Sequence, residues 1–242
     1  PSRQAKYADM GGAVGLSLSG RELGIRHLMS VNLLKRLESS IESFRLTIER
    51  VRTQIEDTLN RIQRHEKGDV HTAREPDSSL DTDVLDDYED IAAVETKKFT
   101  IELADIDTVQ WAEYLRDDLK VLDQLLERIK NIDAVHDGKL LQLQADLVDK
   151  IKNPINHGNR KALIFTAFAD TAEYLYEHIA PFMLKAYGIH TALVTGQIEA
   201  RSTLKVKDGL NFNKALTLFS PISKEKSIAY PETVGEIDIL IA

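Results

Sequence analysis

Three stretches in the last third of the chain decide the fold: KALIFTAF (161–168), HTALVTG (190–196) and EIDILIA (236–242). Each is a short, mostly apolar run, which is typical of a buried strand. The segments between them have the length and spacing of helices. Strands that alternate with helices form βαβ units with right-handed crossovers, so the sequence predicts an α/β fold with a parallel sheet.

The expected elements of this region are a strand at 162–168, a helix at 171–187, a strand at 191–194, a helical stretch around 200–212 and a strand at 237–241. Asp170 is placed to cap the first helix. Residues 217–234 contain two prolines and predict a loop at one edge of the sheet. Because a strand of a parallel sheet is normally followed by a loop, a chain that ends in a strand at Ala242 is expected to be a piece of a larger protein.

The first two thirds of the chain have a helical pattern. A glycine-rich entry loop is expected at residues 1–28, and apolar residues then recur every three or four positions over residues 33–62. This narrow stripe predicts a helix of about 35 residues that needs a partner helix. A second stripe at 111–132 supplies the partner, so the two predict a long antiparallel helical hairpin. A shorter helix is expected at 139–151, ended by Pro154.

Charge is distributed unevenly along the chain, whose formal net charge is −8. Residues 76–150 carry 20 acidic and 8 basic side chains. Residues 1–75 carry 10 acidic and 13 basic side chains, and residues 151–242 carry 9 and 10. The two flanking thirds are therefore free to face a polyanion locally, which the net charge alone would conceal.

Several classes of protein are disfavoured by missing motifs. The chain has no cysteine, which removes disulfides and thiolate catalysis, and no Gly-Lys-Ser/Thr phosphate loop, which a nucleotide hydrolase acting alone would need. Its seven histidines are scattered, so no metal site is expected. No window approaches the roughly 20 apolar residues of a membrane helix, and a cytoplasmic protein is expected.

Four blocks carry a resemblance to a known family: VNLLKRLESSIESF (31–44), KALIFTAF (161–168), LFSPISK (218–224) and EIDILIA (236–242). Together they resemble the Swi/Snf-type superfamily-two helicases, and most closely the bacterial helicase-domain proteins. The resemblance covers nearly the whole chain. It implies a helical protrusion at 29–155 with an acidic insert at 72–105, followed at 156–242 by a truncated second RecA-like lobe, so that the α/β sheet would be part of a RecA-like fold.

The same resemblance implies a function for the longer protein. It would be an ATP-dependent DNA helicase or translocase, with DNA rather than RNA as its nucleic acid and no membrane partner. The first lobe, with its phosphate loop and acidic magnesium box, would precede Pro1, and the arginine finger would follow Ala242. ATP and magnesium would therefore belong to the parent protein, with no tight binding to this segment, which should not hydrolyse ATP alone. The first RecA-like lobe of the same parent chain would be a partner.

The resemblance implies seven candidate residues for nucleic-acid binding: Thr166, Ala167, Phe168, Gly196, Arg201, Lys35 and Arg36. The first three match the family segment whose backbone and hydroxyl groups contact a phosphate. The glycine and the arginine after the second strand resemble a pair that could bind phosphate through the guanidinium. The two basic residues of the first helix could face the nucleic acid, or could simply be exposed positions of an amphipathic helix. No catalytic residue is expected in this segment.

Two other functions remain open. The regular apolar stripe at 33–62 and the acidic middle third favour a non-enzymatic coiled-coil module that binds a protein partner. A small-molecule-binding α/β domain is a weaker alternative, because the first turn of the sheet lacks the glycines of a dinucleotide site.

Overall fold

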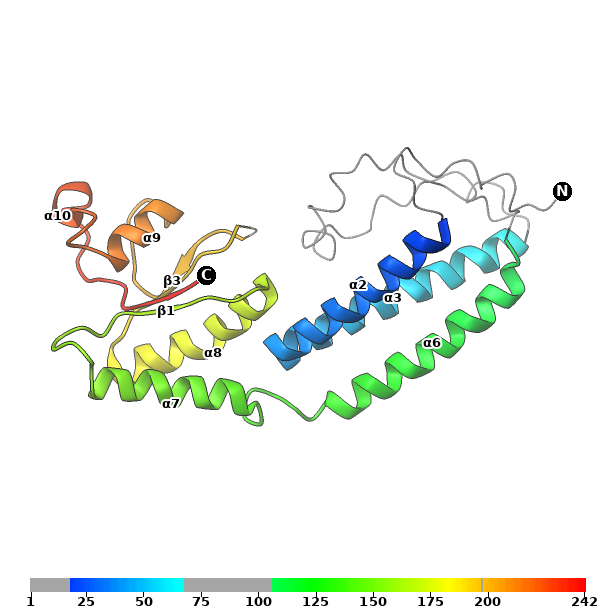
Figure 1. Cartoon of the computed structure of the whole chain (residues 1–242). Helices are drawn as coiled ribbons and strands as arrows, with labels where there is room; N and C mark the ends of the chain where they lie inside the picture. The colour runs from blue at the N-terminus through cyan, green and yellow to red at the C-terminus, as the bar shows by residue number, and fades with distance from the viewer. Residues whose placement is uncertain (1–17, 68–105, 197) are drawn as a thin grey trace. The chain divides into compact units, whose positions relative to one another are not determined.

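The computed structural model describes residues 18–67, 106–196 and 198–242 (Figure 1). Its elements are α2 (Leu18–Ser39), α3 (Ile41–Glu66), α6 (Thr108–Ile129), α7 (Gly138–Lys152), β1 (Ala162–Ile164), α8 (Ala169–Tyr187), β2 (Thr191–Leu193), β3 (Arg201–Ser202), α9 (Phe212–Phe219), α10 (Lys226–Ala229) and β4 (Ile239–Ile241). The described residues divide into two compact units: residues 33–47 and 127–242 belong to unit 2, and residues 18–32, 48–67 and 106–126 belong to unit 1. The fold is mixed α/β, with a long helical hairpin of α2 and α3 followed by a small sheet flanked by helices.

The sheet of unit 2 has four strands in the order β1-β4-β2-β3. Strands β1, β4 and β2 are parallel, and β4 lies between the other two with Ile239 opposite both Ala162 and Thr191. Only β3 is antiparallel, pairing with β2. The α/β prediction with a mostly parallel sheet is thus confirmed, and the carboxyl ends of β1, β4 and β2 share one edge of the sheet.

Helices cover both faces of this sheet. Alternate residues of a strand point to opposite faces, and in β4 Ile239 belongs to a core cluster with Leu147 of α7 and Met183 of α8. Leu240 belongs to a second cluster with Leu218 of α9 on the other face. Strand β4 is therefore buried on both sides, as the centre of a parallel sheet requires, whereas in β1 Leu163 is half exposed.

The single helix expected over residues 33–62 is wrong, because the helix is interrupted at Ser40. The Ser40 hydroxyl accepts a hydrogen bond from the backbone N–H of Ser43 at 3.0 Å, which is the geometry of a helix N-cap. Ser40 therefore starts α3 as α2 ends at Ser39. The chain reverses direction between α2 and α3 at this residue (Figure 1).

Replacing Ser40 with alanine should lower the free energy of unfolding by about 1 kcal/mol, because the N–H of Ser43 loses its acceptor. Urea denaturation followed by circular dichroism measures the change. The matched variant Ser30→Ala removes only an exposed bond to the carbonyl of Arg26 and should stay within about 0.5 kcal/mol of the parent. Equal effects of the two substitutions would contradict a capping role.

The two apolar stripes do pack together within unit 1. Leu59 and Ile62 of α3 form a core cluster with Ala112 of α6. Arg52 Nε lies 2.7 Å from Asp123 Oδ1, so the two helices run antiparallel. The third helix is also confirmed, since α7 spans Gly138–Lys152.

Four local predictions were wrong. The expected helix around 200–212 is replaced by β3 and a turn in which Asp208 and Gly209 have φ of 62° and 77°, a left-handed conformation that a helix cannot include. The expected loop at 217–234 contains the end of α9 and all of α10. Asp170 does not cap α8; the N-cap residue is Phe168, which makes no side-chain cap bond.

The fourth concerns the entry loop at 1–28, because α2 already begins at Leu18; residues 1–17 lie outside the described residues. The acidic insert at 72–105 also lies outside them. Within the described ranges, no helix combines the length and the apolar character needed to cross a membrane.

Candidate nucleic-acid interface

The candidate interface lies where β1 ends and α8 begins, in residues 165–168, which we call the β1–α8 loop. The N–H of Thr166 donates to the carbonyl of Ala242 at 2.8 Å, which keeps the loop in line with β4. The Thr166 hydroxyl donates to the carbonyl of Phe168 at 2.9 Å. This hydroxyl proton is already used inside the loop, so the backbone is the main source of donors for a ligand.

Three successive backbone N–H groups, at the end of this loop and the first residue of α8, are open. In the described part of the chain, the N–H groups of Ala167, Phe168 and Ala169 have no hydrogen-bond acceptor. The first N–H groups of a helix have no partner inside the helix, and the helix dipole adds partial positive charge there. The arrangement can accept the oxygens of a phosphate without a basic side chain.

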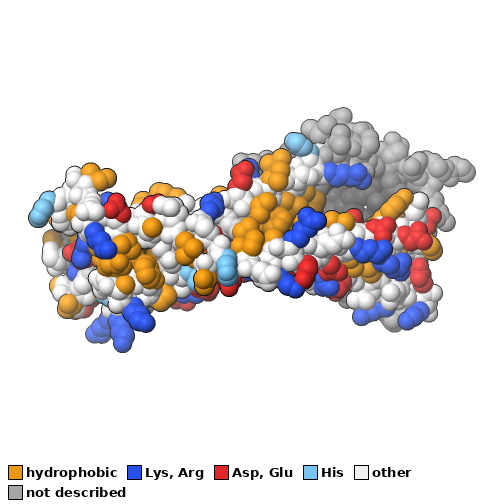
Figure 2. All heavy atoms as spheres, turned by 90° about the horizontal axis from the view of Figure 1, so that it is seen from below, with side chains coloured by type: hydrophobic (Ala, Val, Ile, Leu, Met, Phe, Trp, Pro, Cys, Tyr) orange, Lys and Arg blue, Asp and Glu red, His pale blue; other side chains and the backbone are white. Residues whose placement is uncertain are grey.

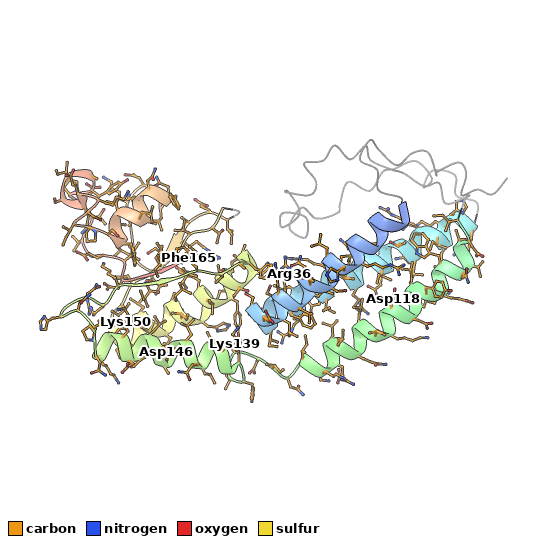
Figure 3. The ribbon with its side chains drawn as sticks, in the orientation of Figure 1. Arg36, Asp118, Lys139, Asp146, Lys150 and Phe165 are labelled. Atoms are coloured by element: carbon orange, nitrogen blue, oxygen red, sulfur yellow. The ribbon has the colours of Figure 1, made fainter. Side chains whose placement is uncertain are left out.

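Arg36 lies behind this loop and not in solvent (Figure 3). It is 3% exposed, its Nη1 lies 3.1 Å from Asp170 Oδ2, and its guanidinium stacks 4.5 Å from the centre of the Phe168 ring. The same Nη1 contacts Ser43 Oγ at 3.4 Å. Arg36 therefore holds the loop in place and offsets the negative charge that Asp170 brings to the first turn of α8.

Hydroxyl groups add to this attachment. Thr171 Oγ1 lies 2.8 Å from Ser39 Oγ and 3.2 Å from Ser40 Oγ. The end of α2 is thus fixed to the start of α8 by an ion pair, a cation–π contact and two hydroxyl contacts, all within unit 2.

The other candidates are more dispersed. Lys35 is exposed on α2, and Gly196 is exposed in the loop after β2, at the same edge of the sheet as the β1–α8 loop. Arg201 lies on β3, where its Nη2 is 2.6 Å from Glu173 Oε1 and its guanidinium is 5.6 Å from the centre of the Tyr176 ring. A phosphate at Arg201 would have to compete with Glu173.

A neighbouring cleft of about 440 Å³ has the wrong charge for phosphate. Its lining includes five carboxylates and one guanidinium, with apolar side chains between them: Glu42, Asp133, Asp170, Glu173, Glu177 and Arg45. Figure 2 shows that the face it displays mixes basic and acidic side chains without one large basic patch. The local donors of the β1–α8 loop therefore matter more than the general surface charge.

Sequence reasoning missed a buried polar pair beside this cleft. The Tyr174 hydroxyl donates to Asp137 Oδ2 at 3.0 Å, and Asp137 Oδ1 accepts the N–H groups of Lys139 and Leu140 at 2.9 and 3.1 Å. Burial, and then the hydrogen bond to Asp137, raise the pKa of Tyr174 well above its usual value of 10.0. The available signal was the Asp-Gly pair before an apolar run at 139–151, which is typical of a helix N-cap.

Among the residues that the structure describes, no three His, Asp or Glu side chains gather closely enough to hold a metal ion. The chain matches no protein-family model, no curated protein and no solved structure. The geometry of the β1–α8 loop is therefore the main structural indication of function.

Proposed function

We propose that this chain contacts nucleic-acid phosphates as part of the second motor lobe of an ATP-dependent DNA helicase or translocase. The observation that carries the proposal is the row of open N–H groups at Ala167, Phe168 and Ala169, at the carboxyl edge of a parallel sheet. Ligands of open α/β sheets bind at this edge. The resemblance implies phosphate contact by Thr166, Ala167 and Phe168, two of which belong to this row.

The arrangement favours binding that does not depend on base sequence. Backbone N–H groups recognise phosphate oxygens, which every nucleotide carries. Arg36 supports the site by offsetting Asp170, whose carboxylate would otherwise repel a phosphate at the start of α8. ATP hydrolysis by the parent protein would supply the energy for movement, and the β1–α8 loop would bind the nucleic-acid strand along which the protein moves.

The first test measures the anisotropy of fluorescein-labelled DNA of two unrelated sequences with the full chain. We expect weak binding that is equal for both sequences and falls about tenfold or more between 50 and 200 mM salt, because bound phosphates release counterions. Ala167→Glu should weaken binding about tenfold by placing a carboxylate beside the open N–H groups. The matched control is Ala145→Glu on the exposed surface of α7.

Two results of this binding experiment would contradict the proposed phosphate contact. Equal affinity at the two salt concentrations would rule out phosphate contacts as the source of binding. Equal affinities of the Ala167→Glu and Ala145→Glu variants would move the contact away from the β1–α8 loop. Melting curves of both variants check that the fold is retained.

A coiled-coil interaction module remains the second candidate. Part of the apolar stripe of α3 is already used, since Leu59 and Ile62 pack against α6. The observation that favours a partner is on α6 itself, where Tyr114 and Val121, one heptad apart, are 60% and 56% exposed. A stoichiometric protein complex that is lost in Tyr114→Lys, together with no DNA binding, would favour this candidate.

A further inference from the structure

Two arginine–carboxylate pairs lie at the start of α8, and they differ in exposure. Arg36 pairs with Asp170, and their side chains are 4% and 16% exposed. Arg201 of β3 pairs with Glu173 of α8, with 2.6 Å between Nη2 and Oε1, and these side chains are 43% and 38% exposed. Breaking a buried pair leaves charge in poorly hydrated surroundings, whereas water readily replaces the contact of an exposed pair. Of the two pairs, only that of Arg201 and Glu173 can therefore exchange partners at little cost.

Arg201 lies at the edge of the sheet where the phosphate contact is proposed. It is paired in register with Leu193, the last residue of β2, so it lies at the carboxyl end of that strand. The carboxyl end of β1, which leads into the β1–α8 loop, is at the same edge because β1, β4 and β2 are parallel. Glu173 follows Ala169 by about 6 Å along the helix axis, which is one helical turn. Since a nucleic-acid strand carries a phosphate at every nucleotide, one strand can reach both the open N–H groups and Arg201.

The ring of Tyr176 is a second contact that holds the guanidinium of Arg201. This ring belongs to α8, and its centre is 5.6 Å from Arg201 Cζ. An aromatic face attracts a cation whether or not a carboxylate is also present. The carboxylate of Glu173 can therefore leave while the guanidinium stays in place. A phosphate, which accepts two parallel N–H bonds from a guanidinium, can then take the position of the carboxylate.

We propose that Glu173 is an autoinhibitory group, which occupies Arg201 in the free protein and is displaced when a nucleic-acid phosphate binds the guanidinium. This inference rests on the proposed function and adds its regulation. A strand that is already bound at the β1–α8 loop presents its next phosphate to Arg201 at a high effective concentration. It therefore displaces the carboxylate more readily than a free phosphate ion does.

The experiment measures, by anisotropy at low salt, the affinity of the full chain and its variants for fluorescein-labelled oligo-dT. Glu173→Gln should bind about fivefold more tightly than the parent, because Arg201 no longer has to give up a charged partner. The matched control is Glu177→Gln, which removes the same charge from an exposed position one turn further along α8 and should change the affinity less than about twofold. In an Arg201→Ala background, Glu173→Gln should have no larger effect than Glu177→Gln, because no guanidinium is left to release.

The outcomes separate this inference from the function on which it rests. Equal affinities of Glu173→Gln and Glu177→Gln would overturn the autoinhibitory role, and so would a gain in Glu173→Gln that persists in the Arg201→Ala background. In either case, weaker binding of Ala167→Glu would leave phosphate contact at the β1–α8 loop intact. No DNA binding by the parent and by all variants would overturn the proposed function itself. Melting curves of each variant check that the fold is retained.

Discussion

Replacing Arg36 with alanine should lower the free energy of unfolding by about 3 kcal/mol, because the substitution removes a guanidinium that pairs with the Asp170 carboxylate in a mostly buried place. The side chains of Arg36 and Asp170 are 4% and 16% exposed, so water cannot fully replace the lost contact. The cation–π contact with Phe168 is lost at the same time. Urea denaturation followed by circular dichroism measures the change.

The neighbouring residue supplies the control for this experiment. Lys35 is exposed on the same turn of α2, and Lys35→Ala should change the free energy of unfolding by less than about 0.5 kcal/mol. The double variant Arg36→Ala, Asp170→Asn should be more stable than Arg36→Ala alone, since the carboxylate that loses the guanidinium of Arg36 is no longer charged. If Arg36→Ala were as stable as Lys35→Ala, Arg36 would not hold the β1–α8 loop.

The positions of Lys35 and Arg36 show what a sequence pattern can and cannot predict. Both are basic residues of one amphipathic helix, and their types alone do not say which one is buried. The difference arises from Asp170, 134 residues further along the chain, whose partner only the folded structure reveals. The strands β1 and β4, in contrast, were predictable because short, continuous apolar runs are typical of the strands of a parallel sheet.

Local backbone chemistry explains the other discrepancies. The break at Ser40 was visible as a serine, but the apolar stripe continues through Leu37, Ile41 and Phe44 with helical spacing and concealed it. The turn at Asp208 and Gly209 is an Asp-Gly pair, which favours a left-handed turn over a helix. Phe165 was assigned to a buried strand by its apolar neighbours, but β1 ends at Ile164 and the Phe165 side chain is 77% exposed.

Replacing Asp137 with alanine should lower the free energy of unfolding by about 3 kcal/mol, an effect as large as that of Arg36→Ala. The reason is that this one carboxylate accepts hydrogen bonds from both the start of α7 and Tyr174. It caps α7, and loss of a cap costs about 1 kcal/mol. It also accepts the hydroxyl of Tyr174, and a buried hydroxyl without a partner costs about 1 to 3 kcal/mol more. Urea denaturation of the variant, with Asp146→Ala on the exposed surface of α7 as the control, measures the total.

A second substitution separates the two contributions. Tyr174→Phe removes the hydroxyl and leaves the cap intact, so Asp137→Ala should cost less when it is made in the Tyr174→Phe background than in the parent. The remaining cost, about 1 kcal/mol, is then that of the cap alone. If Asp137→Ala costs the same in both backgrounds, the hydroxyl contributes nothing measurable. The attachment of α7 to α8 would in that case depend on apolar packing, in which Leu140 and Leu147 meet Ile179 and Met183.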